Sequence, residues 1–484
     1  MLTQPFMHHP ASRIPGWLVV GLLALPWVAP WAPGPQSNTV PLLLSWGVLA
    51  VLLILQRLPS ALELAQAWAC AALLSSAMGL LQYFGEAGAL GGWVHGAGHL
   101  GEAMGNLRQR NQLATLTSIG AVAVLWWHAQ GLRTAPALGM AALLALGNAA
   151  TGSRTGLLQW LLLPALSGLW QALAPRRRPV WSWPVLLGGL AVYLLGSLAL
   201  PHLLGTWRGA EISNAMVRMG EDNGCGSRSV LWGNVLHLIG QHPWTGWGWG
   251  ELKYAHYMAS YPGPRFCDIL GNAHNLPLHL AFAFGVPATL LALGGVLVLV
   301  LRARPWRLPH AGSVLAWGVL TPIGLHSLLE YPLWYGPFQL ALVFGILLLW
   351  RQGSAWLARH RQALQWLGLC GLCLIALMAW DYQRVRQVYL SAPQRSALWR
   401  DDPWGAARQT WFFGDAARFA DLTSTPVTAN NAQAMLDSSL AMLHYSPEPR
   451  VIDQLIQSAR LLGQDRLADW HQAQKQAVYG ASAH

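Results

Sequence analysis

Charged side chains are scarce in this chain. Only 10% of its 484 residues are Asp, Glu, Lys or Arg, whereas 54% are hydrophobic and the mean hydropathy is +0.34. Soluble domains carry about 25% charged residues, because these form much of the surface that faces water. The composition therefore excludes an ordinary soluble protein and favours a membrane protein.

Several motifs of soluble enzymes are also missing. The sequence has no Walker-type phosphate loop, no two Cys-x2-Cys pairs for zinc and no Gly-x-Ser-x-Gly nucleophile elbow. These absences exclude ATP hydrolysis and α/β-hydrolase chemistry. We expect neither a cofactor nor a bound metal.

Long apolar runs recur through the first four fifths of the chain. A helix needs about 20 residues to cross a hydrocarbon core of roughly 30 Å, and these runs lack the polar and apolar alternation of barrel strands. The pattern predicts an all-α, polytopic membrane protein of about eleven transmembrane helices. The first lacks a small-residue cleavage site, so we expect it to be retained. The predicted spans are residues 16–33, 40–56, 64–83, 112–131, 135–151, 156–174, 181–204, 275–301, 311–329, 334–351 and 364–381.

Basic residues in the short loops predict the orientation. Loops rich in Lys and Arg usually stay in the cytoplasm, and an N-terminus on that side puts every strongly basic short loop there. Loops 84–111, 152–155, 205–274 and 330–333 and the tail after Asp381 then lie outside. Much of the net charge of +11 follows this bias, and the remainder is dispersed among the outer loops. This fits membrane lipid as a partner and argues against nucleic acid.

Two domains are expected from the change in composition near residue 381. Residues 1–381 form the membrane domain, with a large outer loop at 205–274, and residues 382–484 form a small helical domain. Its Ala-rich helices resemble tetratricopeptide (TPR) hairpin repeats, and it is either a packing cap or a docking surface for an acceptor. Within the outer loop, Cys225 and Cys267 pair in a disulfide or stay free, and the sequence leaves both states open.

Arginines stand in polar clusters on the predicted outer side. The clusters are residues 105–112, with Arg108 and Arg110, the turn 151–156, with Arg154, and the segment 226–232, with Arg228. A guanidinium keeps its charge at any physiological pH and grips phosphate oxygens with paired N–H groups. The alternative is that these arginines only reach lipid headgroups. The Gly and Ser neighbours of Arg154 and Arg228 favour a specific turn at both positions over this alternative.

Two histidines accompany these arginines. His274 begins a His-Asn-x9-Gly stretch and is suited to take a proton from a hydroxyl near neutral pH, although a buried structural imidazole is the alternative. His326 and Glu330 are four residues apart, so they share a helix face beside Tyr331. Ionisable groups so placed in a membrane protein indicate function, and a stabilising ion pair is the alternative.

These motifs resemble the O-antigen ligase and O-antigen polymerase superfamily. The His-Asn-x9-Gly stretch, the Arg-Ser-Val-Leu-Trp segment from Arg228 and the Gln-x-Arg-Asn-Gln and Ser-Arg-Thr-Gly turns carry the resemblance. The His-Ser-Leu-Leu-Glu-Tyr-Pro-Leu-Trp-Tyr segment from His326 and the helical tail look like PglL-type protein O-oligosaccharyltransferases. Ala288 stands where the ligase motif often has Gly, Thr or Tyr.

The resemblance implies a GT-C-like, metal-independent glycosyltransferase of the bacterial inner membrane with its active site on the periplasmic face. It implies an undecaprenyl-pyrophosphate-linked glycan donor and an acceptor protein such as a pilin. His274 and Arg228 would be the catalytic residues. Substrate binding would involve Arg108, Arg110, Arg154, Arg265, His326, Glu330 and Tyr331.

Other functions remain alternatives. An O-antigen ligase would transfer the glycan to lipid A core, and a polymerase would extend the glycan chain. A transporter of lipid-linked glycans would normally show inverted repeats, which the sequence lacks, and a membrane scaffold would not need clustered Arg and His.

Overall fold

The computed structural model describes residues 14–96, 99–173, 180–209, 224–308, 310–350, 356 and 358–480. The structure is 74% helix and has no β-strand in these ranges, which confirms the all-α prediction. The α-helices are α1 (Gly16–Val28), α2 (Thr39–Ile54), α3 (Ala61–Tyr83), α4 (Arg110–Ala129), α5 (Thr134–Ala150), α6 (Arg154–Leu173), α7 (Trp183–Arg208), α9 (Arg228–Gln241), α10 (Leu252–Met258), α11 (Leu276–Phe284), α12 (Val286–Ala303), α13 (Ala311–Ser327), α14 (Gly336–Leu349), α16 (Arg361–Arg386), α17 (Pro403–Arg408), α18 (Gly414–Ser424), α19 (Ala432–Tyr445), α20 (Pro449–Leu461) and α21 (Asp465–Tyr479). Short 3₁₀ helices are η1 (Ala87–Trp93), η2 (Gly105–Leu107), η3 (Gly224–Gly226), η4 (Pro332–Trp334), η5 (Gln387–Tyr389) and η6 (Ala392–Gln394).

Helices overlap all eleven predicted spans. Within the described residues, five helical segments are long and apolar enough to cross a membrane: α3, α6, α7, α12 and the segment Arg361–Tyr389 that contains α16. These five helices indicate that the chain is a membrane protein. The other six spans stay predictions.

Helix α4 lies at the centre of the bundle and packs against α3, α5, α6 and α13. Nearly all of it is buried, although it contains several polar residues. Two of them bond to Gln159 of α6, which donates to the Thr115 hydroxyl at 2.9 Å and accepts from the Ser118 hydroxyl at 2.9 Å. Paired in this way, polar groups are tolerated in an apolar interior. They also lower the hydropathy of α4 below that of a simple lipid-facing span.

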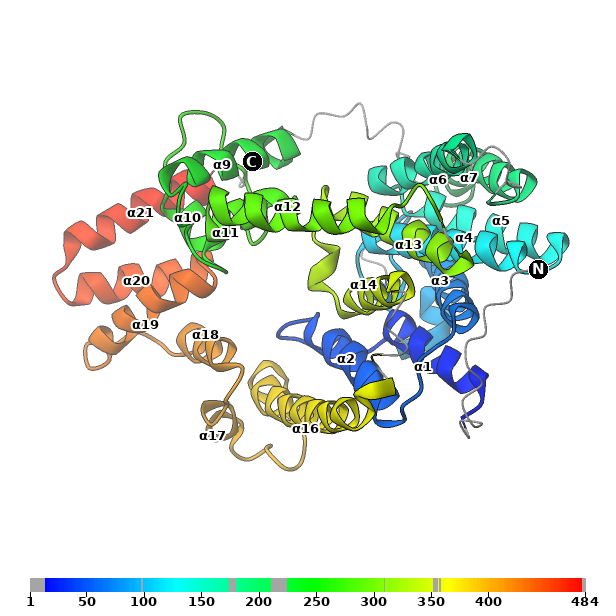
Figure 1. Ribbon diagram of the computed structural model, residues 1–484. Coiled ribbons are helices and arrows are strands. Elements are labelled where there is room, and N and C mark those ends of the chain that lie inside the picture. The colour runs from blue at the N-terminus through cyan, green and yellow to red at the C-terminus, as the bar shows by residue number, and fades with distance from the viewer. Residues whose placement is uncertain are drawn as a thin grey trace.

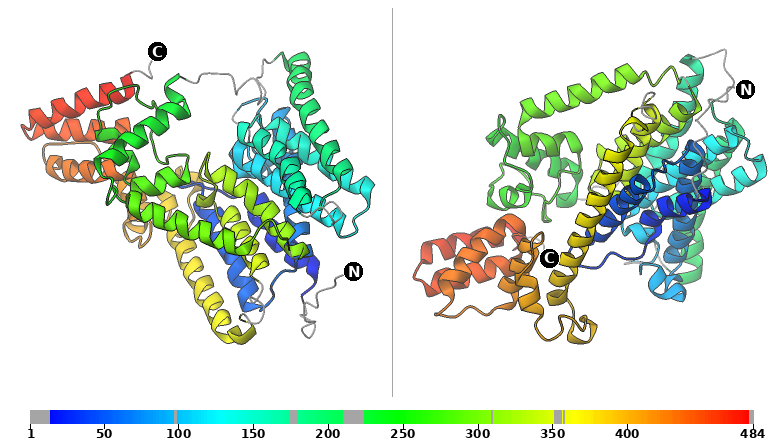
Figure 2. Two further views of the ribbon diagram at one scale, coloured as in Figure 1. Left: turned by 45° about the horizontal axis from the view of Figure 1, so that its top comes forward. Right: turned by 60° about the horizontal axis from the view of Figure 1, so that its bottom comes forward.

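Helix α12 has the opposite environment. Thr289 is its single buried residue, and its leucines and valines are largely exposed. Figure 2 shows α12 and the long α16 along the outside of the bundle. Contiguous apolar surface of this kind is unfavourable in water and favourable against lipid tails.

The predicted span 275–301 is not one continuous helix. It divides into α11 and α12 at Gly285, whose φ of +83° ends the first helix. A Cβ at this position would lie 2.3 Å from the carbonyl oxygen of Trp244, so only glycine fits. The approaching loop bonds to the end of α11, where Trp247 donates its backbone N–H to the Phe282 carbonyl at 2.8 Å. The glycine of the His-Asn-x9-Gly stretch therefore marks a helix break.

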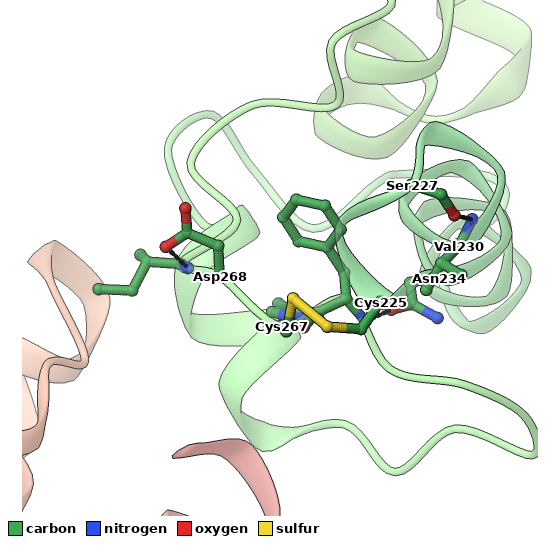
Figure 3. The surroundings of a disulfide bond; sticks show 9 residues. Cys225, Ser227, Val230, Asn234, Cys267 and Asp268 are labelled. Carbon is green, nitrogen blue, oxygen red and sulfur yellow. Dashed lines mark hydrogen bonds between the residues drawn. A yellow bond between two sulfur atoms is a disulfide. The ribbon is translucent and has the colours of Figure 1, made fainter. Parts of the chain in front are cut away.

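A disulfide joins the two sides of the outer loop. Cys225 and Cys267 are bonded, with their Cα atoms 5.4 Å apart (Figure 3). Next to it, Asn234 of α9 accepts a 2.8 Å hydrogen bond from the backbone N–H of Phe266 and donates a 3.0 Å bond to the Pro264 carbonyl. The segment before α11 is thereby fixed against α9.

The C-terminal helices α17–α21 form a separate layer, coloured orange to red in Figure 1. Their apolar core includes Tyr257 from α10, so this layer packs directly on the outer loop. At the other end, the buried Asp381 of α16 accepts hydrogen bonds from the Thr410 hydroxyl at 2.7 Å and the backbone N–H groups of Trp411 and Phe412 at 2.9 and 2.8 Å. The likeness to TPR repeats and the boundary at residue 381 stay predictions.

Candidate functional site

Three charged side chains from distant parts of the sequence meet beside the C-terminal end of α13. Glu330 follows this helix, Arg228 is the first residue of α9, and His274 stands two residues before α11. His274 Nδ1 lies 2.6 Å from Glu330 Oε2, and the Arg228 guanidinium bonds to Glu330 Oε1 and to the Leu329 carbonyl. We call these three residues the His274–Glu330–Arg228 cluster.

Helix capping places two of these residues. Ser227 caps α9 by accepting a hydrogen bond from the Val230 N–H at 3.3 Å, which sets Arg228 at the helix start. Asn275 caps α11 in the same way, and its amide also donates to the Leu328 carbonyl at 3.1 Å. Short polar residues at the N-cap satisfy free backbone N–H groups. In both motifs the residue beside the cap is the one that reaches Glu330.

The backbone of His274 has an uncommon conformation. Its φ of +49° lies in the left-handed region, which non-glycine residues rarely adopt. The Asn272 side chain accepts the His274 N–H at 2.9 Å, and the Trp232 indole donates to the Ala273 carbonyl at 3.1 Å. Strained positions that are held by several contacts are frequent at functional sites.

Charge and burial compete at Glu330. Burial alone would raise the pKa of this carboxyl, but the hydrogen bond from His274 and the positive charge of Arg228 help to outweigh it, so the pKa is lowered. Glu330 therefore stays ionised at neutral pH. For Arg228, burial lowers the guanidinium pKa, Glu330 raises it, and the nearby positive charge of Arg154 lowers it further. The positive charges of Arg228 and Arg154 thus lie near each other, and such a pair favours a bound anion.

Asn111 connects the turn of Arg154 to the cluster. Its amide donates to Glu330 Oε1 at 3.1 Å, and its carbonyl oxygen accepts from the Ser153 hydroxyl at 2.6 Å. Ser153 in turn caps the start of α6 by accepting the Gly156 N–H at 3.0 Å. Residues from three of the polar clusters identified in the sequence thus contact Glu330 directly or through one neighbour.

His326 and Tyr331, the neighbours of Glu330 in the sequence motif, lie in different surroundings from each other. His326 is buried between α13 and α4, and its Nδ1 lies 2.9 Å from the Thr115 hydroxyl. Its side chain points into the bundle, whereas Glu330 turns to Arg228 and His274. Tyr331 packs edge to face against the His274 ring, with 5.0 Å between the centroids.

The remaining predicted arginines bind elsewhere. Arg108 donates to two backbone carbonyls of the α1–α2 connection at 2.9 and 3.0 Å. Arg265 donates to two carbonyls near the end of α10, and its guanidinium lies over the Tyr261 ring. Arg110 is 3.4 Å from Glu102. These contacts brace loops, and substrate binding by the three arginines stays a prediction.

Two residues of the site were not among the predicted site residues. Asn111 belongs to the cluster 105–112, but its position beside Glu330 depends on the packing of α4 against α13. Trp232 ends the Arg-Ser-Val-Leu-Trp segment, and only the fold brings its indole to the residue before His274. Across the part of the chain that is described, no group of three His, Cys, Asp or Glu side chains is arranged to hold a metal ion.

Three protein families match the parts of the chain that contain the site residues. Residues 138–293, which include Arg154, Arg228 and His274, match the family "O-Antigen ligase". Residues 314–484, which include Glu330, match "Virulence factor membrane-bound polymerase, C-terminal", and residues 103–128, which include Asn111, match "Protein glycosylation ligase".

Two curated proteins are similar to this chain. A general O-oligosaccharyltransferase of Acinetobacter baylyi is 28% identical over 182 residues, which are 36% of this chain and 31% of that protein. An O-antigen ligase of Pseudomonas aeruginosa is 31% identical over 228 residues, 46% of this chain and 47% of the relative. The similarity thus spans less than half of each relative. Together, the three family matches and the two relatives show that this chain is similar to PglL-type proteins of the O-antigen ligase superfamily.

Proposed function

We propose that this protein transfers a glycan from undecaprenyl pyrophosphate to the hydroxyl of a Ser or Thr residue in a periplasmic or pilin-like protein. The His274–Glu330–Arg228 cluster is the observation that carries the proposal. It joins a proton acceptor, a carboxylate that orients it and a fixed cation within one network. Glycosyltransferase activity of the oligosaccharyltransferase or ligase type is supported by the relatives.

His274 acts as the base in the proposed reaction. The bond to Glu330 Oε2 places the imidazole hydrogen on Nδ1, so Nε2 is free to accept a proton. The acceptor hydroxyl gives its proton to Nε2 while its oxygen bonds to the anomeric carbon of the first sugar. Glu330 stabilises the imidazolium that forms. An oriented base of this kind contributes about 10² to 10⁴ in rate.

Arg228 and Arg154 hold the leaving group. As the bond between the anomeric carbon and the phosphate oxygen breaks, its electron pair and the growing negative charge go to undecaprenyl pyrophosphate. A guanidinium has five N–H groups, so the contacts of Arg228 with Leu329 and Glu330 leave donors for phosphate. Fixed cations lower the barrier where charge develops, and we propose that these arginines take the place that a metal ion would otherwise fill.

The proposed setting is the inner membrane, with the cluster on the periplasmic face and the C-terminal helices outside. The distribution of basic loops supports this sidedness, and the Cys225–Cys267 disulfide fits an oxidising compartment. The contact between α10 and the C-terminal helices brings that layer to the outer loop that carries His274. An acceptor protein docked on these helices would lie near the site.

Ligation to lipid A core is the second candidate. It is favoured by the O-antigen ligase relative, which aligns over more residues than the oligosaccharyltransferase. The same cluster performs either reaction, because both acceptors offer a hydroxyl. Glycan polymerisation is a further alternative within this chemistry, and transport of a lipid-linked glycan is more remote because it needs no base.

One expression experiment separates these functions. The protein is produced in cells that make a known lipid-linked glycan, with a pilin-like protein and lipid A core both present, and both acceptors are examined for the glycan. We expect the pilin-like protein to become glycosylated. Glycan on lipid A core alone would assign the ligase reaction, and no transfer to either acceptor would contradict both proposals.

A further inference from the structure

A continuous series of aromatic rings leads away from His274. Tyr331 packs on the His274 ring, and Trp334 follows with its centroid 6.3 Å from that of Tyr331. Trp249 then stacks on Trp334 at 5.5 Å with the ring planes 7° apart, and Phe284 stacks on Trp249 at 5.7 Å. We call Tyr331, Trp334, Trp249 and Phe284 the aromatic ladder.

The middle of the ladder is held rigidly. The buried His279 packs edge to face against both Trp249 and Trp334, with centroids 5.3 and 5.1 Å away. Trp249 stands in the turn Gly246-Trp247-Gly248-Trp249-Gly250, whose three glycines all have positive φ. Gly248 donates its N–H to the Ala283 carbonyl at 3.1 Å, which fixes the turn to the end of α11. Since α11 begins beside His274, the ladder has a fixed position relative to the base.

The outer half of the ladder is open to its surroundings. Trp249 is 56% exposed and Phe284 47% exposed, although both are held in defined stacks. The uncovered parts of such fixed rings offer apolar surface to a ligand. The C–H groups on the faces of a sugar ring carry a slight positive charge and pack favourably on the negative face of an aromatic ring.

We propose that the aromatic ladder binds the sugar rings of the transferred glycan. This inference rests on the proposed function, because it takes the first sugar to react beside His274. That sugar then lies near Tyr331, and the sugars further from the pyrophosphate lie on Trp334 and Trp249. The ladder therefore selects donors by glycan length. Its continuity with the His274–Glu330–Arg228 cluster favours this occupant over the bilayer interface, where Trp residues also gather.

The test compares two donors with one acceptor peptide: undecaprenyl pyrophosphate carrying a single sugar, and the same lipid carrying several sugars. For Trp249→Leu we expect the KM of the longer donor to rise about 3- to 10-fold, as expected for the loss of one aromatic stack, while the KM of the single-sugar donor stays unchanged. Trp249→Phe should retain most of the affinity because it keeps a ring. Trp244→Leu is the matched control, since Trp244 is 78% exposed on the same loop and lies outside the ladder.

A leucine at position 249 also separates the sugar site from a membrane anchor. Loss of an interfacial anchor, which needs an amphipathic ring, would affect transfer from both donors alike, whereas loss of a sugar site affects only the longer donor. The inference would be overturned if Trp249→Leu changed the KM of both donors equally. It would also be overturned if Trp244→Leu raised the KM of the longer donor as much as Trp249→Leu does.

A second measurement does not depend on transfer. Free oligosaccharide, released from the longer donor, is titrated into the purified full-length protein and binding is followed by tryptophan fluorescence. We expect saturable binding that is weakened in Trp249→Leu and unchanged in Trp244→Leu. Equal binding by the wild type, Trp249→Leu and Trp244→Leu would contradict sugar binding by the aromatic ladder. Binding as expected, without transfer to any acceptor, would contradict the proposed function and leave the sugar site standing.

Discussion

The Trp232 indole donates a 3.1 Å hydrogen bond to the backbone carbonyl of Ala273, the residue before His274. This bond connects α9, which begins with Arg228, to the segment that places His274. Removing the bond should let His274 move away from Glu330 without changing any group that contacts substrate.

We therefore predict that Trp232→Phe lowers kcat about 10-fold with little change in the KM of the donor, because small displacements of a catalytic group are costly. Transfer is measured in membranes and normalised to protein level. Trp411→Phe serves as the control, since Trp411 is 70% exposed in the C-terminal region. If Trp232→Phe were as active as the wild type, Trp232 would have no role in positioning His274.

The disulfide should stabilise the same arrangement. Cys225 lies three residues before Arg228, and Cys267 lies seven before His274, in a closed loop of 42 residues. A cross-link over such a loop contributes about 2 to 4 kcal/mol. Replacement of both cysteines by Ser should lower the melting temperature and reduce activity. Cys370→Ser, a free cysteine in α16, is the control and should leave both unchanged.

Arg228 should not be replaceable by lysine. Its guanidinium contacts Glu330 and Leu329 at once and still has donors for phosphate, whereas an ammonium offers a single point of charge. We predict that Arg228→Lys retains less than about a tenth of the wild-type transfer rate, the loss that corresponds to one strong hydrogen bond. The protein level is measured by immunoblot. A lysine variant as active as wild type would show that paired contacts are not needed.

The C-terminal helices should loosen at acidic pH through His471. Its Nδ1 lies 2.9 Å from the Tyr257 hydroxyl of α10, and burial lowers the pKa of His471 to about 4. The unfolded value is about 6.5, so between these values the unfolded chain binds more protons. Stability is therefore complete above about pH 6.5 and is lost progressively as the pH falls towards 4.

The check is the melting temperature of the full-length protein in detergent across this range, for wild type and His471→Gln. We expect the Gln variant to show the weaker dependence on pH. Some dependence should remain, because burial also lowers the pKa of His256 to about 3. Identical pH profiles would mean that His471 does not contribute.

Sequence patterns predict the helices of the membrane domain because a backbone in lipid must satisfy its own hydrogen bonds. A long apolar run therefore indicates a helix from its composition alone. The break at Gly285 was not predicted, because it arises from the approach of the loop at Trp244, a contact between distant segments. The central position of α4 likewise depends on the partners of its polar residues.

The residues of the cluster are predictable one by one, but their connections are not. Chemistry and resemblance single out His274, Arg228 and Glu330, whereas the sequence pairs Glu330 with His326, four residues earlier. In the folded chain Glu330 turns to His274 instead, just beyond the end of α13 at Ser327. The Glu330 backbone N–H still bonds to the His326 carbonyl at 2.7 Å, so the difference lies in the direction of the side chains.

The 2.6 Å contact between His274 and Glu330 is the reason for which we propose His274 as the base. The most direct test is the transfer rate of His274→Gln and His274→Ala in membranes, normalised to protein level and measured at saturating donor. A base typically contributes about 10² to 10⁴ in rate, so we predict a loss of that size in both variants with donor binding unchanged. Near wild-type turnover of His274→Gln, which keeps hydrogen-bonding groups but is no base, would contradict the account.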